Sequence, residues 1–248
     1  MLGQGFSKLV FGFDHAQSRD KLEIIKPSRF EDLIAVLALS QAYYAKDLFE
    51  KYDARKNVSV EIPYLLPELK PILEETYGVI VYKEQFIQIV STVAGYSFAR
   101  ADHLLRDIGK RKSVFIDKER AHFIKASTAK GFLEIQVTKI FNILDPISAF
   151  VQLKSHFVGH AKIAFQTGFL KANYPTEFIA AHLQNTFDNP EKLNEILREA
   201  KRMGVSIRLN VADIDNHKIS VENGVIQLYQ DIYERCFGDS DSNPPDKY

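Results

Sequence analysis

The stretch Leu69–Gln85 constrains the fold of this 248-residue chain more than any other. Pro71 suits the first turn of a helix, where no backbone N–H is needed, and Gly78 suits the residue that ends it. The run Val79–Tyr82 is β-branched and aromatic, which favours a short strand or extended segment. A long amphipathic helix is then expected from Lys83. The stretch therefore predicts a buried corner between two helices.

Helical periodicity dominates the rest of the chain. Apolar residues recur at spacings of three and four, which predicts helices over these ranges: 28–44 with a further turn at 45–52, 84–92, 98–108, 118–130, 135–144, 147–172 as one helix or two, 175–183, and a segment that starts at Asn189-Pro190-Glu191. Ser28 and Glu31 have the spacing of a capping box, and Asp145-Pro146 is expected to stop a helix. Residues 53–67 are polar with two prolines and predict a loop.

The few β signals lie near the two ends. A short strand is expected at Lys8–Phe13 and another at Val205–Val211. Residues 218–221 and 225–228 flank Asn223-Gly224, a dipeptide typical of a tight hairpin turn. The fold class is therefore mainly α: a multi-helix domain with a small β-hairpin element near the C-terminus. We expect an extended segment at 1–27, a helical domain at 28–204, a small β element at 205–237 and a disordered tail at 238–248.

Composition narrows the possible functions. The formal net charge is +0, so binding to nucleic acid would need a local basic patch. The single cysteine, Cys236, excludes an internal disulfide and a multi-cysteine zinc site, and no activating partner is evident for it. No apolar run is long enough for a membrane span, and no secretion signal is evident. These features predict a cytoplasmic protein without a membrane partner.

Several blocks of residues together resemble one protein family. The order of residues in Ile72–Gln85 resembles the block ILEETYGVIxYQEQ of the bacterial C-family replicative DNA polymerases, the alpha subunit of DNA polymerase III. Further blocks are similar to this family in the same order and with matching separations: Phe30–Ala35, Gly95–Ser97 with Ala101-Asp102, Gly109–Lys112, Lys154–His156, Leu170–Pro175 and Arg202–Gly204. The resemblance runs from about Val10 to Leu228 and implies a fingers-like domain, linked to DNA replication, of a truncated and degenerate homologue.

The chain departs from the family pattern where the family lies near nucleotide or DNA. The family's VFQLES reads as Val10–His15 here, and its YRPGP reads as Ser40–Tyr44. The first arginine of its LRRAMG is replaced by Leu105, which leaves only Arg106. The asparagine before its KSH is replaced by Leu153. Each change removes a polar or conformationally special residue.

The resemblance also implies what this chain needs for catalysis. In the family, the catalytic aspartates sit in a palm domain and hold two magnesium ions. They would lie upstream of Met1, so this chain alone is expected to lack nucleotidyltransferase activity. No cofactor is expected in the chain itself, and magnesium is expected only with a complete palm domain.

Basic residues are the candidate phosphate-binding groups, because ammonium and guanidinium groups match phosphate oxygens. The resemblance places such contacts at Arg106, Lys110, Arg111, Lys112, Lys154, Ser155 and His156. The alternative for the basic cluster is a solvated turn between two helices. The expected partners are DNA or a nucleoside triphosphate, bound weakly, and other replicase subunits or a palm-containing chain.

Other candidate sites have simpler explanations. Asp213 and Asp215 alternate along a strand end, but a turn before Asn216 is favoured over a metal site. His156 and His160 have helical spacing for zinc, yet no third ligand is evident nearby. Three aromatic residues are more typical of a core than of base stacking: Tyr77, Tyr82 and Phe86.

Three functional hypotheses follow from the sequence. The first is a stand-alone fingers-like module that binds DNA or nucleotide phosphate. The second is one subunit of a split polymerase that is active only with a separate palm-containing chain. The third is a folded remnant that has lost function, since apolar positions persist where polar motif residues do not.

Overall fold

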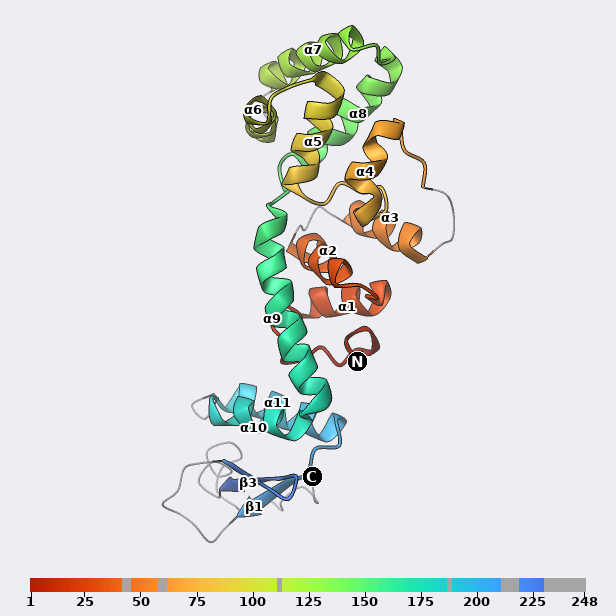
Figure 1. Ribbon diagram of the computed structural model, residues 1–248. Coiled ribbons are helices and arrows are strands. Elements are labelled where there is room, and N and C mark those ends of the chain that lie inside the picture. Colours follow the sequence, from red (N-terminus) through yellow and green to blue (C-terminus); the bar gives the residue numbers. More distant parts are fainter. Residues whose placement is uncertain (42–45, 58–61, 111–112, 187–188, 211–218, 230–248) are drawn as a thin grey trace. The chain divides into compact units, whose positions relative to one another are not determined.

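The computed structural model describes the chain except for residues 42–45, 58–61, 111–112, 187–188, 211–218 and 230–248 (Figure 1). The chain divides into a larger unit, Ala16–Lys162, and a smaller unit that combines Met1–His15 with Ile163–Tyr248. Helices dominate both units, and a small sheet lies near the C-terminus, which confirms the predicted fold class. The predicted tail and Asp213, Asp215 and Cys236 lie outside the described residues.

The larger unit is built from helices. Its elements are α1 (Ala16–Ile25), α2 (Phe30–Gln41), α3 (Lys46–Asn57), the short turns η2 (Pro67–Leu69), α4 (Lys70–Leu73) and η3 (Glu74–Thr76), then α5 (Lys83–Ala94), α6 (Phe98–Gly109), α7 (Ser113–Ala129), α8 (Glu134–Ile147) and the start of α9 (Lys154–Asn173). In Figure 1, α5, α6, α7 and α8 form one bundle.

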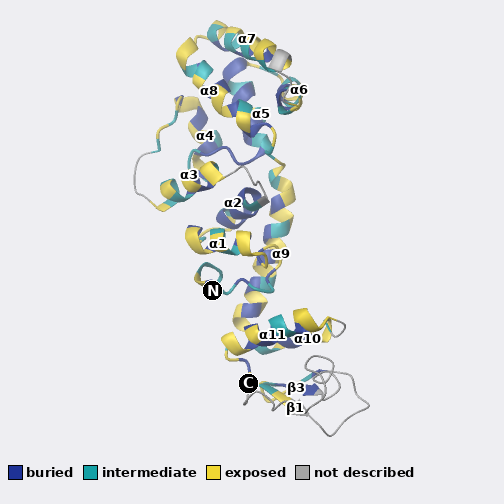
Figure 2. Ribbon diagram, turned by 180° about the vertical axis from the view of Figure 1, so that it is seen from behind, coloured by how far each residue is buried: buried dark blue, intermediate teal, exposed yellow. Residues whose placement is uncertain are grey.

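The core of this bundle follows the helical period of α5. Phe86, Ile89, Val90 and Val93 are buried along one face of that helix. They pack in one cluster with apolar residues of α6, α7 and α8, among which the rings of Phe123 and Phe141 lie 5.6 Å apart. Each large apolar side chain buried in this way stabilises the fold by about 1.5–3 kcal/mol relative to an exposed one. Figure 2 shows this buried interior within an exposed outer surface.

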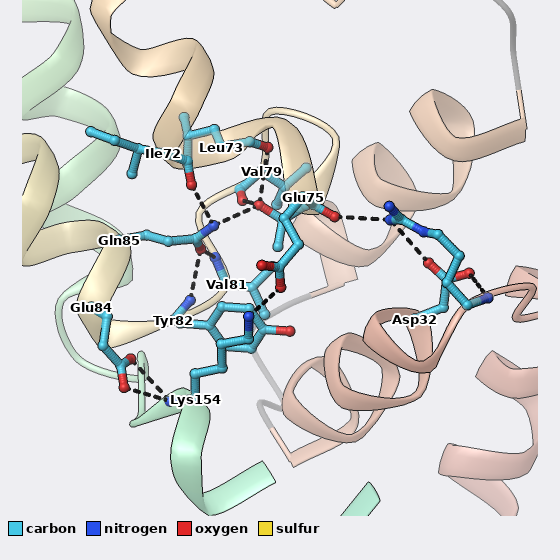
Figure 3. A network of polar contacts seen from close by, with 12 residues as sticks. Asp32, Ile72, Leu73, Glu75, Val79, Val81, Tyr82, Glu84, Gln85 and Lys154 are labelled. Carbon is cyan, nitrogen blue, oxygen red and sulfur yellow. Dashed lines mark hydrogen bonds and ion pairs between the residues drawn. The ribbon is translucent and has the colours of Figure 1, made fainter. Parts of the chain in front are cut away.

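Gln85 holds the corner that the sequence predicts. Its side-chain oxygen accepts hydrogen bonds from the backbone N–H groups of Val81 (2.9 Å) and Tyr82 (3.1 Å). Its side-chain nitrogen donates to Ile72 O (3.1 Å) and to the Thr76 hydroxyl (2.7 Å) (Figure 3). Gln85 therefore ties the turn before the extended segment to the helix after it.

Gly78 is required at this corner by both conformation and space. Its φ is +76°, a region that L side chains rarely adopt. A Cβ at this position would lie 2.6 Å from Ile62 Cγ2 and 2.8 Å from a guanidinium nitrogen of Arg55. The chain can therefore turn at Gly78 only because the residue has no side chain.

The N-terminal segment differs from the prediction. Residues 16–25 form α1, so the segment 1–27 is not extended throughout. The predicted strand Lys8–Phe13 is instead a succession of turns, with Val10 N bonded to Ser7 O and Phe13 N to Val10 O. Val10 and Phe13 are both fully buried. A strand would point residues three apart to opposite faces, whereas turns bring both inward.

The capping residue of α2 is Asp32 rather than Glu31. The Asp32 carboxylate accepts the backbone N–H groups of Ser28 (2.9 Å) and Arg29 (3.2 Å). The reason is register: α2 begins at Phe30, so Asp32 is its third residue. The carboxylate is fully buried, accepts the Tyr52 hydroxyl (3.0 Å) and lies 3.6 Å from the Lys56 ammonium. Burial alone would raise the pKa of Asp32, but these donors and the lysine hold it below its usual value.

Two predicted helix ends are also wrong. α3 continues to Asn57, inside the predicted loop 53–67, because the fully buried Tyr52 anchors it to Asp32. α8 continues through Pro146 to Ile147 instead of stopping at Asp145-Pro146. Proline removes one hydrogen bond near the end of a helix, and the buried Leu144 and Ile147 hold the last turn in place.

The smaller unit combines helices with a small sheet. Its elements are η1 (Leu2–Gln4), the remainder of α9, α10 (Pro175–Gln184), α11 (Pro190–Arg202), β1 (Ile207–Asn210), β2 (Ser220–Glu222) and β3 (Val225–Tyr229). The predicted start of α11 is confirmed, since the Asn189 side chain accepts Lys192 N at 3.0 Å. Apolar residues of α10 and α11 pack with β3, so the predicted boundary between residues 204 and 205 falls within this unit.

The hairpin prediction is confirmed, and the sheet contains one further pairing. β2 and β3 pair antiparallel around Asn223 (φ 52°) and Gly224 (φ 76°), as a tight hairpin turn requires. β1 pairs parallel with β3, which gives the strand order β1-β3-β2. Periodicity predicts the strand near β1 but not its partner.

A buried ion pair fixes the N-terminal segment of the smaller unit. The Lys171 ammonium is fully buried and lies 2.5 Å from the Glu199 carboxylate. It also donates to Phe6 O (3.1 Å) and Lys8 O (2.7 Å). Lys171 therefore joins α9, α11 and the first residues of the chain. Burial lowers its pKa, although Glu199 opposes that shift.

Candidate functional site

The candidate phosphate-binding residues lie at the ends of two helices of the larger unit. Arg106 and Lys110 lie in the last turn of α6 and just after it, and Lys154, Ser155 and His156 form the first turn of α9. Arg111 and Lys112 lie outside the described residues. The structure therefore describes five of the seven candidates.

Arg106 is connected to the start of α5. Its guanidinium lies 2.6 Å from the Asp102 carboxylate, one helical turn earlier on α6. The other oxygen of Asp102 lies 2.6 Å from the Lys83 ammonium, on the first residue of α5. The hydrogen bond from the Lys83 ammonium is the main reason that the pKa of the Asp102 carboxyl lies below its usual value. Burial opposes this shift, and the charges of Lys83 and Arg106 add to it. Asp102 thus stays ionised and holds both cations.

Lys154 is connected to the same end of α5. Its backbone N–H donates to both carboxylate oxygens of Glu84, at 3.0 and 2.9 Å (Figure 3). Its ammonium lies 2.5 Å from the Glu75 carboxylate and 5.6 Å from the centre of the Tyr82 ring. Because Glu84 caps α9 from another helix, the position of Lys154 depends on the start of α5.

These two sets of contacts meet at consecutive residues. Lys83 carries the link to Arg106, and Glu84 carries the link to Lys154. The backbone continues the connection, since Lys83 N donates to Gln152 O at 2.9 Å and Tyr82 forms an isolated parallel bridge with Gln152. Arg106 and Lys154, which are far apart in sequence, are therefore both connected to the first residues of α5. We call Lys83 and Glu84, together with Glu75, Asp102, Arg106 and Lys154, the α5 start.

Three acidic residues of the α5 start were not among the predicted site residues: Glu75, Glu84 and Asp102. Local patterning offered signals for two of them. Glu84 lies in the first turn of a predicted helix, where a carboxylate is favoured, and Asp102 lies four residues before Arg106, a spacing that favours an ion pair on one helix. The contacts of Glu84 and Glu75 with Lys154, and of Asp102 with Lys83, cross between elements, and spacing within one helix does not reveal them.

Lys110 lies four residues after Arg106 and is about as exposed. Its ammonium lies 3.6 Å from Asp107 on the same turn, and 64% of its side chain is exposed, against 63% for Arg106. Gly109 next to it approaches the chain after α8, since a Cβ there would lie 3.2 Å from Ser148 O. This close approach fixes the backbone from which Lys110 extends.

Ser155 and His156 are exposed at the first turn of α9. The imidazoles of His156 and His160 lie 4.4 Å apart between ring centres. Among the residues that the structure describes, no group of three histidine, cysteine, aspartate or glutamate side chains could hold a metal ion. The described helices also include none that is long and apolar enough to cross a membrane.

The three candidate stacking residues are part of the packed interior. Tyr82 and Phe86 are buried, so the expectation of a core role is confirmed for both. Tyr77 is half-buried, with its ring 5.1 Å from that of Tyr52 and 5.0 Å from the Arg29 guanidinium. The Tyr82 and Phe86 rings therefore lie in the core, and the Arg29 guanidinium lies over one face of the Tyr77 ring.

Two departures from the family pattern differ in their surroundings. Leu105 is buried in the core cluster of α5 to α8, so an arginine at this position would have to place its charge among apolar side chains. Leu153, by contrast, is 48% exposed directly before Lys154. A change back to a polar residue is therefore easily accommodated at Leu153 but not at Leu105.

The α5 start has one chemical property that matters for ligands. Both candidate cations of the α5 start are already paired with carboxylates: Lys154 with Glu75 and Arg106 with Asp102, which also pairs with Lys83. Such partly exposed pairs are worth only about 0–1 kcal/mol each. A phosphate group, whose oxygens match ammonium and guanidinium groups as carboxylate oxygens do, could therefore displace Glu75 or Asp102 at small cost.

Comparisons with known proteins give a uniform result. The sequence profile described as "Bacterial DNA polymerase III alpha subunit finger domain" matches residues 1–131. The DNA polymerase III subunit alpha of Treponema pallidum is 38% identical over 226 residues, which are 91% of this chain and 19% of that protein. The subunit of the same name from Borreliella burgdorferi is 37% identical over 207 residues, 84% of this chain and 18% of that protein. That from Staphylococcus aureus is 34% identical over 207 residues, 84% of this chain and 19% of the protein. The chain thus spans about a fifth of the length of these relatives.

Proposed function

The chain belongs to the family of the bacterial DNA polymerase III alpha subunit finger domain, and from this we propose that it binds the phosphate groups of DNA or of a nucleoside triphosphate at the α5 start. The binding groups are the side chains of Arg106 and Lys154, with Lys110 as a further exposed contributor. Arg111 and Lys112, next to Lys110 in sequence, belong to the same proposal. Ser155 and His156 would add hydrogen bonds from the first turn of α9.

One observation carries this proposal. Arg106 and Lys154 are separated by 48 positions in the numbering, yet both are connected to the start of α5. Arg106 shares the Asp102 carboxylate with Lys83, and the Lys154 backbone N–H donates to the Glu84 carboxylate. A polyanion that lies across the start of α5 is proposed to reach both cations. The simpler explanation from the sequence, a solvated basic turn, concerns Lys110, Arg111 and Lys112 and does not include Lys154.

The carboxylates at the α5 start determine the strength of binding that we propose. Glu75 and Asp102 must release their cations before these bind phosphate fully. Affinity should therefore be modest and fall steeply with salt, as is typical of contacts to phosphate alone. Base-specific recognition is not part of the proposal, because the nearby tyrosine rings pack in the interior.

We further propose that nucleotidyl transfer requires a palm. Phosphoryl transfer in such polymerases depends on two metal ions held by carboxylates, and the family resemblance assigns those carboxylates to the palm. The role of this chain is then to hold the incoming phosphates, in association with a palm in the same polypeptide or in a separate subunit. Magnesium belongs to that palm and not to the α5 start.

The proposal is tested by fluorescence anisotropy with labelled primer–template DNA at low salt, with unlabelled dATP as competitor. The double variant Arg106→Ala/Lys154→Ala should bind about tenfold more weakly than the unchanged chain. Lys125→Ala is the matched control, because Lys125 is an exposed lysine on α7 of the same unit. Equal affinity of the double variant and the control would reject the α5 start as the site.

The same measurement decides a second candidate function. Leu105 occupies the core where the family pattern has an arginine, which favours a folded remnant whose phosphate-binding role has been lost. A remnant would show cooperative thermal unfolding by circular dichroism but no saturable binding of DNA or dATP. Saturable binding that depends on Lys154 would exclude it.

A further inference from the structure

A cavity of about 310 Å³ lies beside α3, away from the α5 start, and nothing in the proposed function uses it. Its walls come from α3, from the segment that leads into α4, from the turn after Gly78, and from α5 and α8. All of these elements belong to the larger unit.

The floor of the cavity is the apolar core. Leu73, Ile89 and Ile140 line it and are 5%, 1% and 2% exposed. Ile143 lies near the mouth and is 44% exposed. An opening that leads from solvent onto core side chains is the usual form of a site for a small apolar molecule.

The charged side chains on the described walls of the cavity are all positive. Lys51 and Arg55 of α3 line the cavity, and its described lining contains no aspartate or glutamate. Arg55 is fixed in place, since one guanidinium nitrogen donates to Tyr77 O (3.2 Å) and Gly78 O (2.9 Å). Lys51 is exposed, and no described carboxylate forms an ion pair with it. Lys51 is therefore available to an anionic group at the mouth.

A neighbouring groove provides a contrast within the same protein. It shares Leu48, Lys51 and Ile143 with the cavity but is also lined by Asp47. A negative side chain there disfavours an anion. Charge complementarity therefore assigns an anion to the cavity and not to the groove.

The size of the cavity limits the apolar part of the ligand. An apolar cavity of about 150 Å³ holds one benzene ring. The cavity here has about twice that volume, enough for a body of two fused rings. It is at the lower end of the range for small-molecule sites, about 300–1,000 Å³.

We propose that this cavity binds a small amphipathic anion: a compact apolar body of about two rings, with one carboxylate or sulfonate beside Lys51. The apolar body lies against Leu73, Ile89 and Ile140, and the anionic group faces Lys51 with Arg55 behind it. The proposal is independent of phosphate binding at the α5 start, because no residue is shared between the two sites.

The test uses 2-naphthoate as the anion and 2-naphthylmethanol as its neutral analogue, with isothermal titration calorimetry on the full chain. The unchanged chain should bind one equivalent of 2-naphthoate. Ile143→Trp fills the mouth and should weaken binding at least about tenfold, as expected when a hydrophobic pocket loses its space. Lys51→Gln should weaken 2-naphthoate by about threefold, the size of an exposed charge pair, and leave the neutral analogue unchanged. Lys125→Gln is the control and should bind like the unchanged chain.

A second measurement does not depend on the variants. Methyl resonances of isoleucine should shift on addition of 2-naphthoate through the ring current, with the largest shifts at Ile89, Ile140 and Ile143. Three results would overturn the proposal. The first is the absence of saturable binding of 2-naphthoate. The second is binding that Ile143→Trp does not affect, with shifts confined to isoleucines other than Ile89, Ile140 and Ile143. The third is equal affinity of the unchanged chain for 2-naphthoate and 2-naphthylmethanol.

Discussion

The Lys154 ammonium lies 2.5 Å from the Glu75 carboxylate, and this pair occupies the place where the proposed phosphate would bind (Figure 3). Both side chains are about one-third exposed, 31% and 37%. The pair is thus accessible to a competing anion. In the proposed site, Glu75 therefore takes the place at Lys154 that a phosphate would take.

Removal of the Glu75 charge should therefore strengthen DNA binding. Glu75→Gln frees Lys154 from its partner, and the affinity should rise by about two- to fivefold, the worth of a partly exposed ion pair. Anisotropy with primer–template DNA at low salt measures the change. Asp117→Asn is the control for net charge, since Asp117 is exposed on α7. A gain no larger than that of the control would contradict competition between Glu75 and phosphate.

Gln85 should be essential for the stability of the larger unit. Gln85→Leu leaves the N–H groups of Val81 and Tyr82 and the carbonyl of Ile72 without their partner. The free energy of unfolding should fall by about 3 kcal/mol, because each unsatisfied buried group costs about 1–3 kcal/mol. Urea unfolding followed by circular dichroism gives the value. Gln88→Leu, on an exposed position of the same helix, should change it by less than about 0.5 kcal/mol.

The sequence predicted this corner because its determinants are local. Pro71, Gly78 and the β-branched run act through backbone conformation within a few residues, and so do Asn189-Pro190 before α11 and Asn223-Gly224 in the hairpin. These signals do not depend on distant partners.

The candidate site was only partly predictable for the opposite reason. The basic side chains were evident, but Glu84 and Lys154 pair across 70 positions of sequence, and the start of α2 depends on Asp32 and its distant partner Tyr52. The same holds for Lys171, whose ammonium binds the carbonyls of Phe6 and Lys8. Helical periodicity identifies which face of a helix is buried but does not identify its partner.

Asp32 should make the free energy of unfolding of the larger unit depend on pH in the acid range. Its carboxyl has a pKa below the unfolded value of about 3.9. A lowered pKa stabilises the fold above the unfolded pKa, and this contribution is lost as pH falls through the folded pKa. Asp32→Asn should lower the free energy of unfolding at pH 7 by about 1–3 kcal/mol. It should also flatten the loss of stability below about pH 4. An unchanged acid profile in urea unfolding would show that Asp32 is not the group responsible.

The buried pair of Lys171 and Glu199 should be costly to break from one side. Lys171→Met leaves the buried Glu199 carboxylate with only the more distant Arg202 guanidinium, at 3.8 Å, which should destabilise the smaller unit by about 3 kcal/mol. Lys171→Met/Glu199→Leu removes both charges and should recover part of that loss. Hydrogen exchange of β3 amides reports on this unit separately. A double variant that is no more stable than Lys171→Met would show that the carbonyls of Phe6 and Lys8, rather than Glu199, determine the cost.

The salt dependence of DNA binding distinguishes phosphate contacts at the α5 start from binding elsewhere on the chain. Each phosphate contact contributes about 0.9 to the slope of the logarithm of affinity against the logarithm of salt concentration on duplex DNA. If Arg106 and Lys154 both bind phosphate at the α5 start, the double variant Arg106→Ala/Lys154→Ala should lower the magnitude of that slope by about 1.8. Lys125→Ala should leave the slope unchanged. Equal slopes for the double variant and the unchanged chain would contradict the account.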